Sequence, residues 1–92
     1  MNDRNINEHD YVVYILECSD GSLYTGITND LDKRLHTHAL GSASKYTKSR
    51  LPVKCVYTEF GHSKSSALRR EYAIKQLGRS KKLELIDKNI NI

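Results

Sequence analysis

The sequence predicts a small α/β domain of the α+β type, in which a three-stranded sheet is flanked by helices in the order ββαβαα. Runs rich in β-branched and aromatic residues occur at 11–16, 22–28 and 53–60, each bounded by turn residues. Segments with apolar residues at helical spacing follow the second and third runs. The 92 residues allow one domain, which we assign to 10–88, with 1–9 as a flexible tail.

The first two strands are expected to form a hairpin around Ser19-Asp20-Gly21. A three-residue loop with Gly21 in the left-handed conformation places Leu16 opposite Tyr24, so that Tyr14 and Tyr24 share one face of the sheet. A two-residue turn would place the two tyrosines on opposite faces instead. The turn therefore decides whether the two aromatic side chains meet.

A first helix follows the hairpin and can be capped by Asn29 or Asp30. Its apolar side is formed by residues at helical spacing, namely Leu31, Leu35 and Ala39. Two polar side chains, Arg34 and His38, lie in or beside this apolar side and should point toward the sheet. They are either functional groups or, alternatively, a snorkelling arginine and a capped core histidine.

The segment from Gly41 to Arg50 contains small polar residues and cations without any periodicity, so we expect a mobile basic loop. Its candidate nucleic-acid contacts are Lys45, Lys48 and Arg50, which would follow a phosphate backbone. Tyr46 would stack on a base. A passive exposed linker is the alternative interpretation.

The second half of the chain predicts a strand at 53–60 that ends at Gly61, and a serine-capped helix at about 64–77. Gly78 is expected to end that helix in the left-handed conformation. A final helix at about 80–89 has one apolar side, formed by Leu83, Ile86 and Ile90.

Glu71 is an anomaly in the helix at 64–77, because it falls within an apolar arc formed by Ala67, Leu68, Tyr72 and Ile74. Burying an unpaired charge costs several kcal/mol or more, so this carboxylate needs a partner. Arg34 would be the partner in a structural ion pair. A divalent cation is the functional alternative, because Mg²⁺ takes oxygen ligands and often binds only one or two carboxylates beside water and substrate phosphate.

Composition narrows the classes of partner. The net charge of +4 favours an anionic partner, of which nucleic acid is the commonest. No segment approaches the roughly 18 apolar residues of a membrane span, and the polar N-terminus has no signal-peptide core. We therefore expect a cytoplasmic protein without a membrane partner. Cys18 and Cys55 lack partners at zinc spacing and are expected to be small buried thiols.

Two tripeptides on the hairpin, Val12-Val13-Tyr14 and Tyr24-Thr25-Gly26, resemble the motifs that name the GIY-YIG nuclease domain. The family pattern also has an arginine in the first helix, a tyrosine or histidine one turn later and a metal-binding glutamate in a later helix. These positions are matched by Arg34, His38 and Glu71. The resemblance covers essentially the whole domain and is closest to the small, stand-alone bacterial branch of uncharacterised members.

The resemblance implies an endonuclease that depends on Mg²⁺ or Mn²⁺, hydrolyses DNA phosphodiester bonds, selects DNA by its structure and acts in repair or recombination. Its catalytic residues would be Tyr14, Tyr24, Arg34, His38 and Glu71, with Glu71 as the metal ligand. Tyr14 and His38 are alternative candidates for the base. RNA stays open as a substrate.

The family's asparagine after the metal-binding helix has no match, since Asn89 and Asn91 lie in the tail. This departure favours, as the alternative, a nucleic-acid-binding module with weak or no cleavage activity. We expect a monomer, and a protein partner that supplies substrate targeting is a further alternative.

Overall fold

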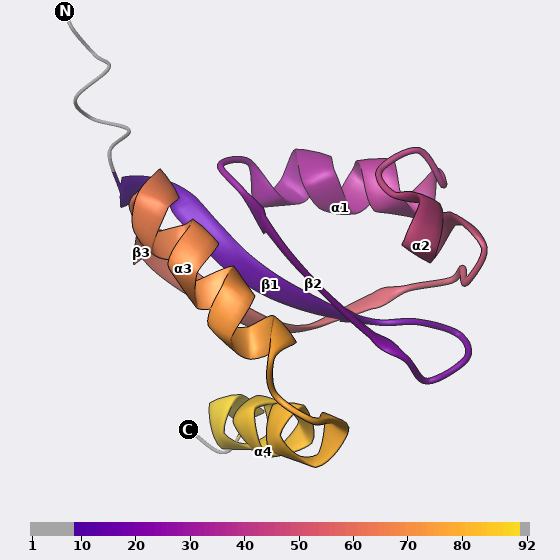
Figure 1. Cartoon of the computed structure of the whole chain (residues 1–92). Coiled ribbons are helices and arrows are strands. Elements are labelled where there is room, and N and C mark those ends of the chain that lie inside the picture. Colours follow the sequence, from indigo (N-terminus) through magenta and orange to yellow (C-terminus); the bar gives the residue numbers. More distant parts are fainter. Residues whose placement is uncertain (1–8, 91–92) are drawn as a thin grey trace, which may run out of the picture.

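The computed structural model describes residues 9–90, so the predicted tail, apart from residue 9, and Asn91 lie outside the described residues. The elements follow one another as β1 (Tyr11–Glu17), β2 (Leu23–Thr28), α1 (Leu31–Ala39), α2 (Lys45–Lys48), β3 (Lys54–His62), α3 (Lys64–Lys75) and α4 (Arg79–Ile90) (Figure 1). The predicted α+β fold with the order ββαβαα is confirmed. The four-residue helix α2 is added to it.

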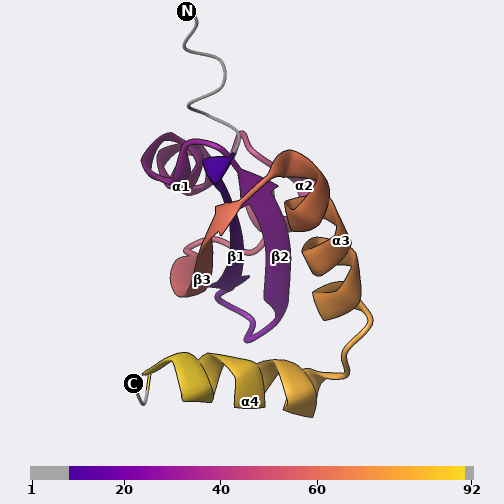
Figure 2. The same cartoon turned by 90° about the vertical axis from the view of Figure 1, so that its left-hand side faces the viewer.

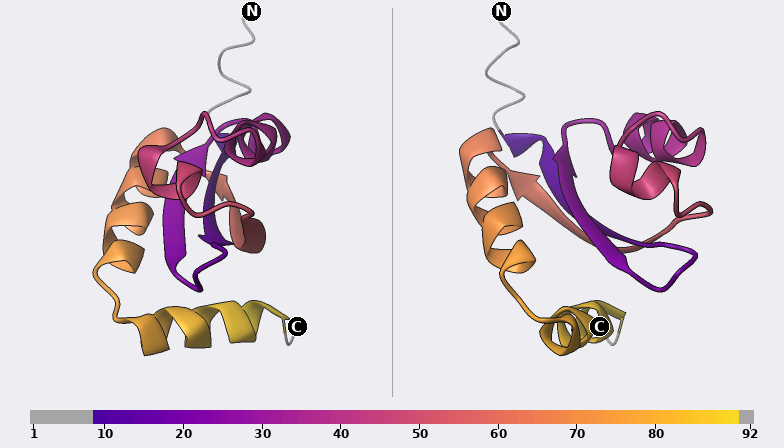
Figure 3. Two further views of the ribbon diagram at one scale, coloured as in Figure 1. Left: turned by 90° about the vertical axis from the view of Figure 1, so that its right-hand side faces the viewer. Right: turned by 45° about the vertical axis from the view of Figure 1, so that its right-hand side comes forward.

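The three strands form one antiparallel sheet in the order β2-β1-β3, so β1 lies in the centre. Every residue from Val12 to Leu16 is buried, which accounts for the unbroken apolar run in the sequence. Helices α1 and α2 cover one face of the sheet and α3 covers the other (Figures 1 and 3). Helix α4 crosses beneath the hairpin end of the sheet (Figure 2).

The hairpin has the three-residue loop that brings the two tyrosines together. Gly21 has a φ of 84° and its N–H donates to the Cys18 carbonyl at 2.9 Å. Leu16 pairs with Tyr24 across the strands, as this loop requires. Tyr14 and Tyr24 therefore share one face of the sheet.

Strand β3 continues beyond its predicted end. Tyr11 pairs with His62 and Val13 pairs with Glu59, so β3 contains one more residue than β1 between these two pairs, which is a β-bulge. Gly61 lies in this bulge with a φ of 83°, a conformation that glycine adopts without steric cost. The prediction that Gly61 ends the strand was therefore wrong, because the glycine bends β3 without stopping it.

Helix α3 ends at Lys75, before its predicted end. Gly78 is not among the glycines with positive φ in the described residues, so the left-handed stop predicted there was wrong. Its carbonyl instead accepts from the N–H of Lys82 at 3.1 Å. Gly78 thus takes part in the start of α4 rather than in the end of α3.

The apolar arc predicted on α3 is narrower in the structure. Ala67 and Ile74, two turns apart, are buried against β1, whereas Leu68 is 46% exposed and Tyr72 is 68% exposed. The prediction of one buried arc was wrong because only a single stripe of the helix touches the sheet.

Helix α4 contributes Ile86 to the same core, together with the partly buried Leu85. Leu83, predicted on the same side, is 42% exposed, and the side chain of Ile90 lies outside the described part of the chain. Cys18 is a buried free thiol, as predicted, and Cys55 is a partly buried one. Among the helices between residues 9 and 90, none combines the length and apolarity that a membrane crossing requires.

Candidate active site

Tyr14 occupies the middle of the central strand, directly opposite Gly26 of β2. A Cβ atom added to Gly26 would lie 2.6 Å from the Tyr14 hydroxyl oxygen and 2.7 Å from Cζ of the same ring. The tyrosine of the first motif therefore lies across the glycine of the second motif, which has no side chain to displace it. Sequence reasoning missed this contact, although the register of a three-residue loop already pairs the two positions.

Helix α1 brings His38 to this tyrosine. The helix begins at an N-cap formed by Asp30, whose Oδ1 accepts from the N–H of Lys33 at 3.2 Å. His38 is completely buried, as the helical periodicity predicts for a side chain that faces the sheet. Its Nε2 lies 2.9 Å from the Tyr14 hydroxyl oxygen. Two of the five predicted catalytic residues are thus hydrogen-bonded to each other.

Tyr24 packs beside this pair. Its ring centroid lies 5.3 Å from that of His38 and 6.5 Å from that of Tyr14. Such tilted and edge-on contacts suit aromatic rings. The side chain is half-buried, whereas the two rings behind it are fully buried. Tyr24 therefore lies at the solvent side of the cluster.

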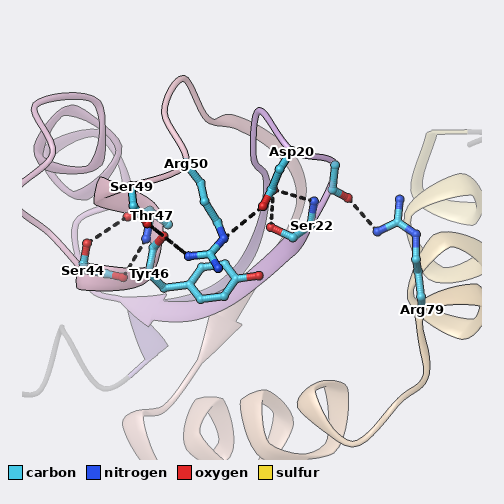
Figure 4. A network of polar contacts seen from close by, with 9 residues as sticks. Asp20, Ser22, Ser44, Tyr46, Thr47, Ser49, Arg50 and Arg79 are labelled. Atoms are coloured by element: carbon cyan, nitrogen blue, oxygen red, sulfur yellow. Dashed lines mark hydrogen bonds and ion pairs between the residues drawn. The ribbon is translucent and has the colours of Figure 1, made fainter.

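Helix α2 contacts the cluster of Tyr14, His38 and Tyr24 through the ring nitrogen of His38 that faces away from Tyr14. The side-chain oxygen of Ser44 caps it by accepting from the N–H of Thr47 at 3.2 Å (Figure 4). Thr47 is completely buried and its Oγ1 lies 3.0 Å from Nδ1 of His38. The prediction of an irregular loop over 41–50 was therefore wrong in its centre. The serine three residues before a threonine was the available signal for a capped turn.

The electrostatic setting gives Tyr14 and His38 defined protonation states. Burial raises the pKa of Tyr14, as do Tyr24 and the charge of Glu71, while a hydrogen-bonding interaction with Arg34 and its charge act in the opposite direction. Burial, followed by the charge of Arg34, lowers the pKa of His38. At neutral pH the phenol is therefore protonated and the imidazole is neutral.

Arg34 carries a donor that the protein leaves unused. Its Nε is buried and has no hydrogen-bond partner among the described residues. The side chain also lines a cavity of about 250 Å³ with residues of the β2–α1 junction and α1, namely Thr28, Asn29, Asp30, Lys33 and Thr37. A buried guanidinium nitrogen without an acceptor is costly unless a ligand oxygen satisfies it.

Glu71 forms an ion pair with Lys75 rather than with Arg34. Its Oε2 lies 3.3 Å from Nζ of Lys75, one turn along α3, and no ion pair with Arg34 occurs in the described residues. The side chain of Glu71 is 20% exposed, so it is partly open to solvent. After burial and Tyr24, its charge makes the smallest contribution that raises the pKa of Tyr14.

A metal held at Glu71 has to fit a single carboxylate. Residues 9–90 contain no group of three or more His, Cys, Asp or Glu side chains that could bind a metal ion together. This donor set does not fit a closed protein cage. It fits Mg²⁺ or Mn²⁺ held by one partly exposed carboxylate, with water and a substrate phosphate as the other ligands.

The basic segment touches the cluster through Tyr46. The ring of Tyr46 stacks on Tyr24, with centroids 5.9 Å apart and an interplanar angle of 28°. The guanidinium of Arg50 lies 3.9 Å from the Tyr46 ring centroid, and its Nε donates to Asp20 at 3.0 Å (Figure 4). Arg50 is thus already engaged by aromatic and acidic partners. Lys48, like Lys45, is exposed.

The sequence matches the family model described as the GIY-YIG catalytic domain over residues 10–84. It is 53% identical over 76 residues to a UPF0213 protein of Staphylococcus saprophyticus, which covers 83% of this chain and 93% of that protein. It is 51% identical over 79 residues to a UPF0213 protein of Streptococcus agalactiae, which covers 86% of this chain and 90% of the relative.

A solved structure agrees with these matches. The solution NMR structure of a UPF0213 protein from Bacillus halodurans superimposes with a TM-score of 0.55 at 49% identity, over 84% of this chain and 82% of the other. The GIY-YIG catalytic domain is a nuclease domain, which implies endonuclease activity on DNA. The resemblance inferred from the motifs is confirmed, and the chain belongs to the GIY-YIG catalytic domain family.

Proposed function

We propose that this protein is a divalent-metal-dependent endonuclease that hydrolyses DNA phosphodiester bonds and selects its substrates by their structure, in repair or recombination. The observation that carries the proposal is the buried 2.9 Å contact between the hydroxyl of Tyr14 and Nε2 of His38, beside the unsatisfied Nε of Arg34. A proton donor, a neutral acceptor and a free cationic donor in one place suit phosphodiester hydrolysis.

Arg34 and Glu71 are suited to the phosphate. The planar guanidinium of Arg34 offers donors that match phosphate oxygens, and a phosphate oxygen would satisfy the buried Nε. Glu71 would hold Mg²⁺ or Mn²⁺. When bound, the cation supplies Lewis-acid stabilisation of charge on the phosphate and the leaving oxygen. Lys75 must give up its contact with the Glu71 carboxylate for this to happen.

Tyr14 and His38 are suited to moving the proton of the attacking water. The pKa of Tyr14 is raised by burial, so the phenol is a poor base until its own proton leaves. The neutral Nε2 of His38 accepts that proton along the existing hydrogen bond, while the phenol oxygen accepts one from the water. The products of this transfer are a hydroxide, a neutral phenol and an imidazolium, so charge and protons balance.

Substrate and water reach Tyr14 and His38 only past neighbouring side chains. Tyr14 and His38 are completely buried, whereas Tyr24 and Arg34 are half-buried. Substrate therefore meets Tyr24 and Arg34 first, and their displacement brings water to the phenol. Catalytic contacts commonly tighten only in the substrate complex.

Lys45 and Lys48 are candidates for contact with the DNA backbone, because both are exposed on α2 next to the cluster. Phosphate contacts fix the position of a protein on a duplex without reading its sequence. Selection by the shape of a branch, flap or nick is the selectivity that such contacts permit. Tyr46 would join a stack of bases once Arg50 moves from its ring.

The test is cleavage of labelled single-stranded, duplex, nicked, flapped and branched DNA in Mg²⁺, Mn²⁺ or EDTA. Glu71→Ala is compared with Glu84→Ala, since Glu84 is an exposed carboxylate on α4. We expect metal-dependent cleavage that is lost in Glu71→Ala and retained in Glu84→Ala. Binding without cleavage by the folded wild-type protein would refute the nuclease proposal and favour a nucleic-acid-binding module.

A further inference from the structure

Thr47 is a buried polar side chain to which neither the motifs nor the prediction of a basic loop assigned a role. It lies on α2 between two exposed residues, Tyr46 and Lys48, but is itself completely buried. Its Oγ1 lies 3.0 Å from Nδ1 of His38 and 3.4 Å from the carbonyl oxygen of Ser44. These contacts continue the hydrogen bond between His38 and Tyr14 away from the sheet.

The donors and acceptors in this series of hydrogen bonds are limited by the chemistry of each group. The Ser44 carbonyl only accepts, and when the hydroxyl of Thr47 donates to it at 3.4 Å, a lone pair of Oγ1 faces His38. Nδ1 of His38 then carries the hydrogen. In a neutral imidazole this leaves Nε2 unprotonated, facing the Tyr14 hydroxyl at 2.9 Å.

The hydrogen bond at Tyr14 independently indicates the same tautomer of His38. Tyr14 is completely buried, and the hydrogen of its phenol has one hydrogen-bond acceptor among the described residues, Nε2 of His38. Arg34, which also interacts with the phenol, has donors only. The opposite tautomer would set the N–H of His38 against the O–H of Tyr14, or leave the phenol hydrogen without an acceptor.

We propose that Thr47 is a positioning residue that holds His38 as the Nδ1–H tautomer, with Nε2 free to accept the proton of Tyr14. The catalytic consequence rests on the proposed nuclease function, whereas the tautomer itself does not. A histidine locked in the wrong tautomer keeps its place but loses its ability to accept the proton.

The test uses three variants of the full chain. Thr47→Val keeps the shape of the side chain and removes the hydroxyl, and Thr47→Ser restores a hydroxyl. Thr25→Val is the matched control, because Thr25 is also a buried threonine and its Oγ1 has no hydrogen-bond partner in the described residues. It lies opposite Ile15, on the other face of the sheet from Tyr14.

The first readout is the pair of ¹⁵N imidazole resonances of His38, because protonated and unprotonated ring nitrogens have well-separated shifts. We expect protonated Nδ1 and unprotonated Nε2 in the wild type, in Thr47→Ser and in Thr25→Val. In Thr47→Val we expect a mixture or the reversed pattern. An Nε2–H tautomer in the wild-type protein overturns the proposal without any variant, even if Thr47→Val does not fold.

The second readout is single-turnover DNA cleavage together with DNA affinity. Thr47→Val should cleave about tenfold or more slowly with unchanged affinity, and Thr47→Ser should recover most of the rate. An unchanged tautomer and an unchanged rate in Thr47→Val would overturn the inference. If the wild type shows the expected tautomer but does not cleave DNA, the nuclease function fails while the role of Thr47 in positioning His38 stands.

Discussion

Replacing Gly26 by alanine should dislodge Tyr14. The added methyl carbon would lie 2.6 Å from the hydroxyl oxygen of Tyr14 and 2.7 Å from Cζ, closer than non-bonded atoms approach. The ring is fully buried between the sheet and its neighbours, so it cannot move away freely. The 2.9 Å contact with His38 would therefore be lost or strained.

The expected cost follows from two opposing effects. Overpacking a dense interior costs about 1–3 kcal/mol, and a buried hydrogen bond left unmade costs about 1–3 kcal/mol more. Alanine regains about 0.4–1 kcal/mol, because it restricts the unfolded chain more than glycine does. We therefore expect Gly26→Ala to lower the free energy of unfolding by about 1–5 kcal/mol.

The assay is urea unfolding of Gly26→Ala beside Gly78→Ala, since nothing lies within 4 Å of a Cβ built at Gly78. The control should remain within about 1 kcal/mol of the wild type. In a Tyr14→Ala background, Gly26→Ala should cost little, which a double-mutant cycle measures. Equal costs of Gly26→Ala with and without the Tyr14 ring would refute the steric reasoning.

Three further predictions concern burial, pH and the metal. Thr25→Val should raise the free energy of unfolding by about 1–2 kcal/mol in urea titrations, because it removes a buried hydroxyl that has no partner in the described residues; a loss of stability would contradict this. Because the pKa of His38 is lowered, the unfolded state binds a proton first on acidification, so stability should fall as pH drops through about 6.5 and less so in His38→Gln. Lys75→Gln should lower the Mg²⁺ concentration needed for half-maximal cleavage, since it frees the Glu71 carboxylate; an unchanged requirement would show that the ion pair does not compete.

Features set by local rules could be predicted from the sequence. The turn residues predict a hairpin at Ser19-Asp20-Gly21, although they leave a two-residue and a three-residue turn open, and the pairing of Leu16 with Tyr24 shows that the three-residue loop is the one formed. The cap at Asp30 and the helical period likewise place His38 against the sheet. Each depends on a few neighbouring residues, so little could override it.

Features set by tertiary contact could not be predicted. Thr47 lies in an aperiodic segment, and its buried hydroxyl contacts His38 of another helix. The helical period locates the middle of the buried stripe on α3 but not its width. Tyr72 was therefore predicted within the stripe, whereas it is exposed. The ion pair between Glu71 and Lys75, in contrast, could have been predicted, because a spacing of four residues on a helix favours it.

The most direct test of the account is the single-turnover cleavage rate of Tyr14→Phe beside Tyr57→Phe. Both variants remove one phenol hydroxyl from a buried ring, but the Tyr57 hydroxyl bonds to Glu59, away from His38. We predict that Tyr14→Phe cleaves DNA about 10²-fold or more slowly with intact DNA binding, and that Tyr57→Phe keeps the wild-type rate. Cleavage at the wild-type rate by Tyr14→Phe would contradict the account.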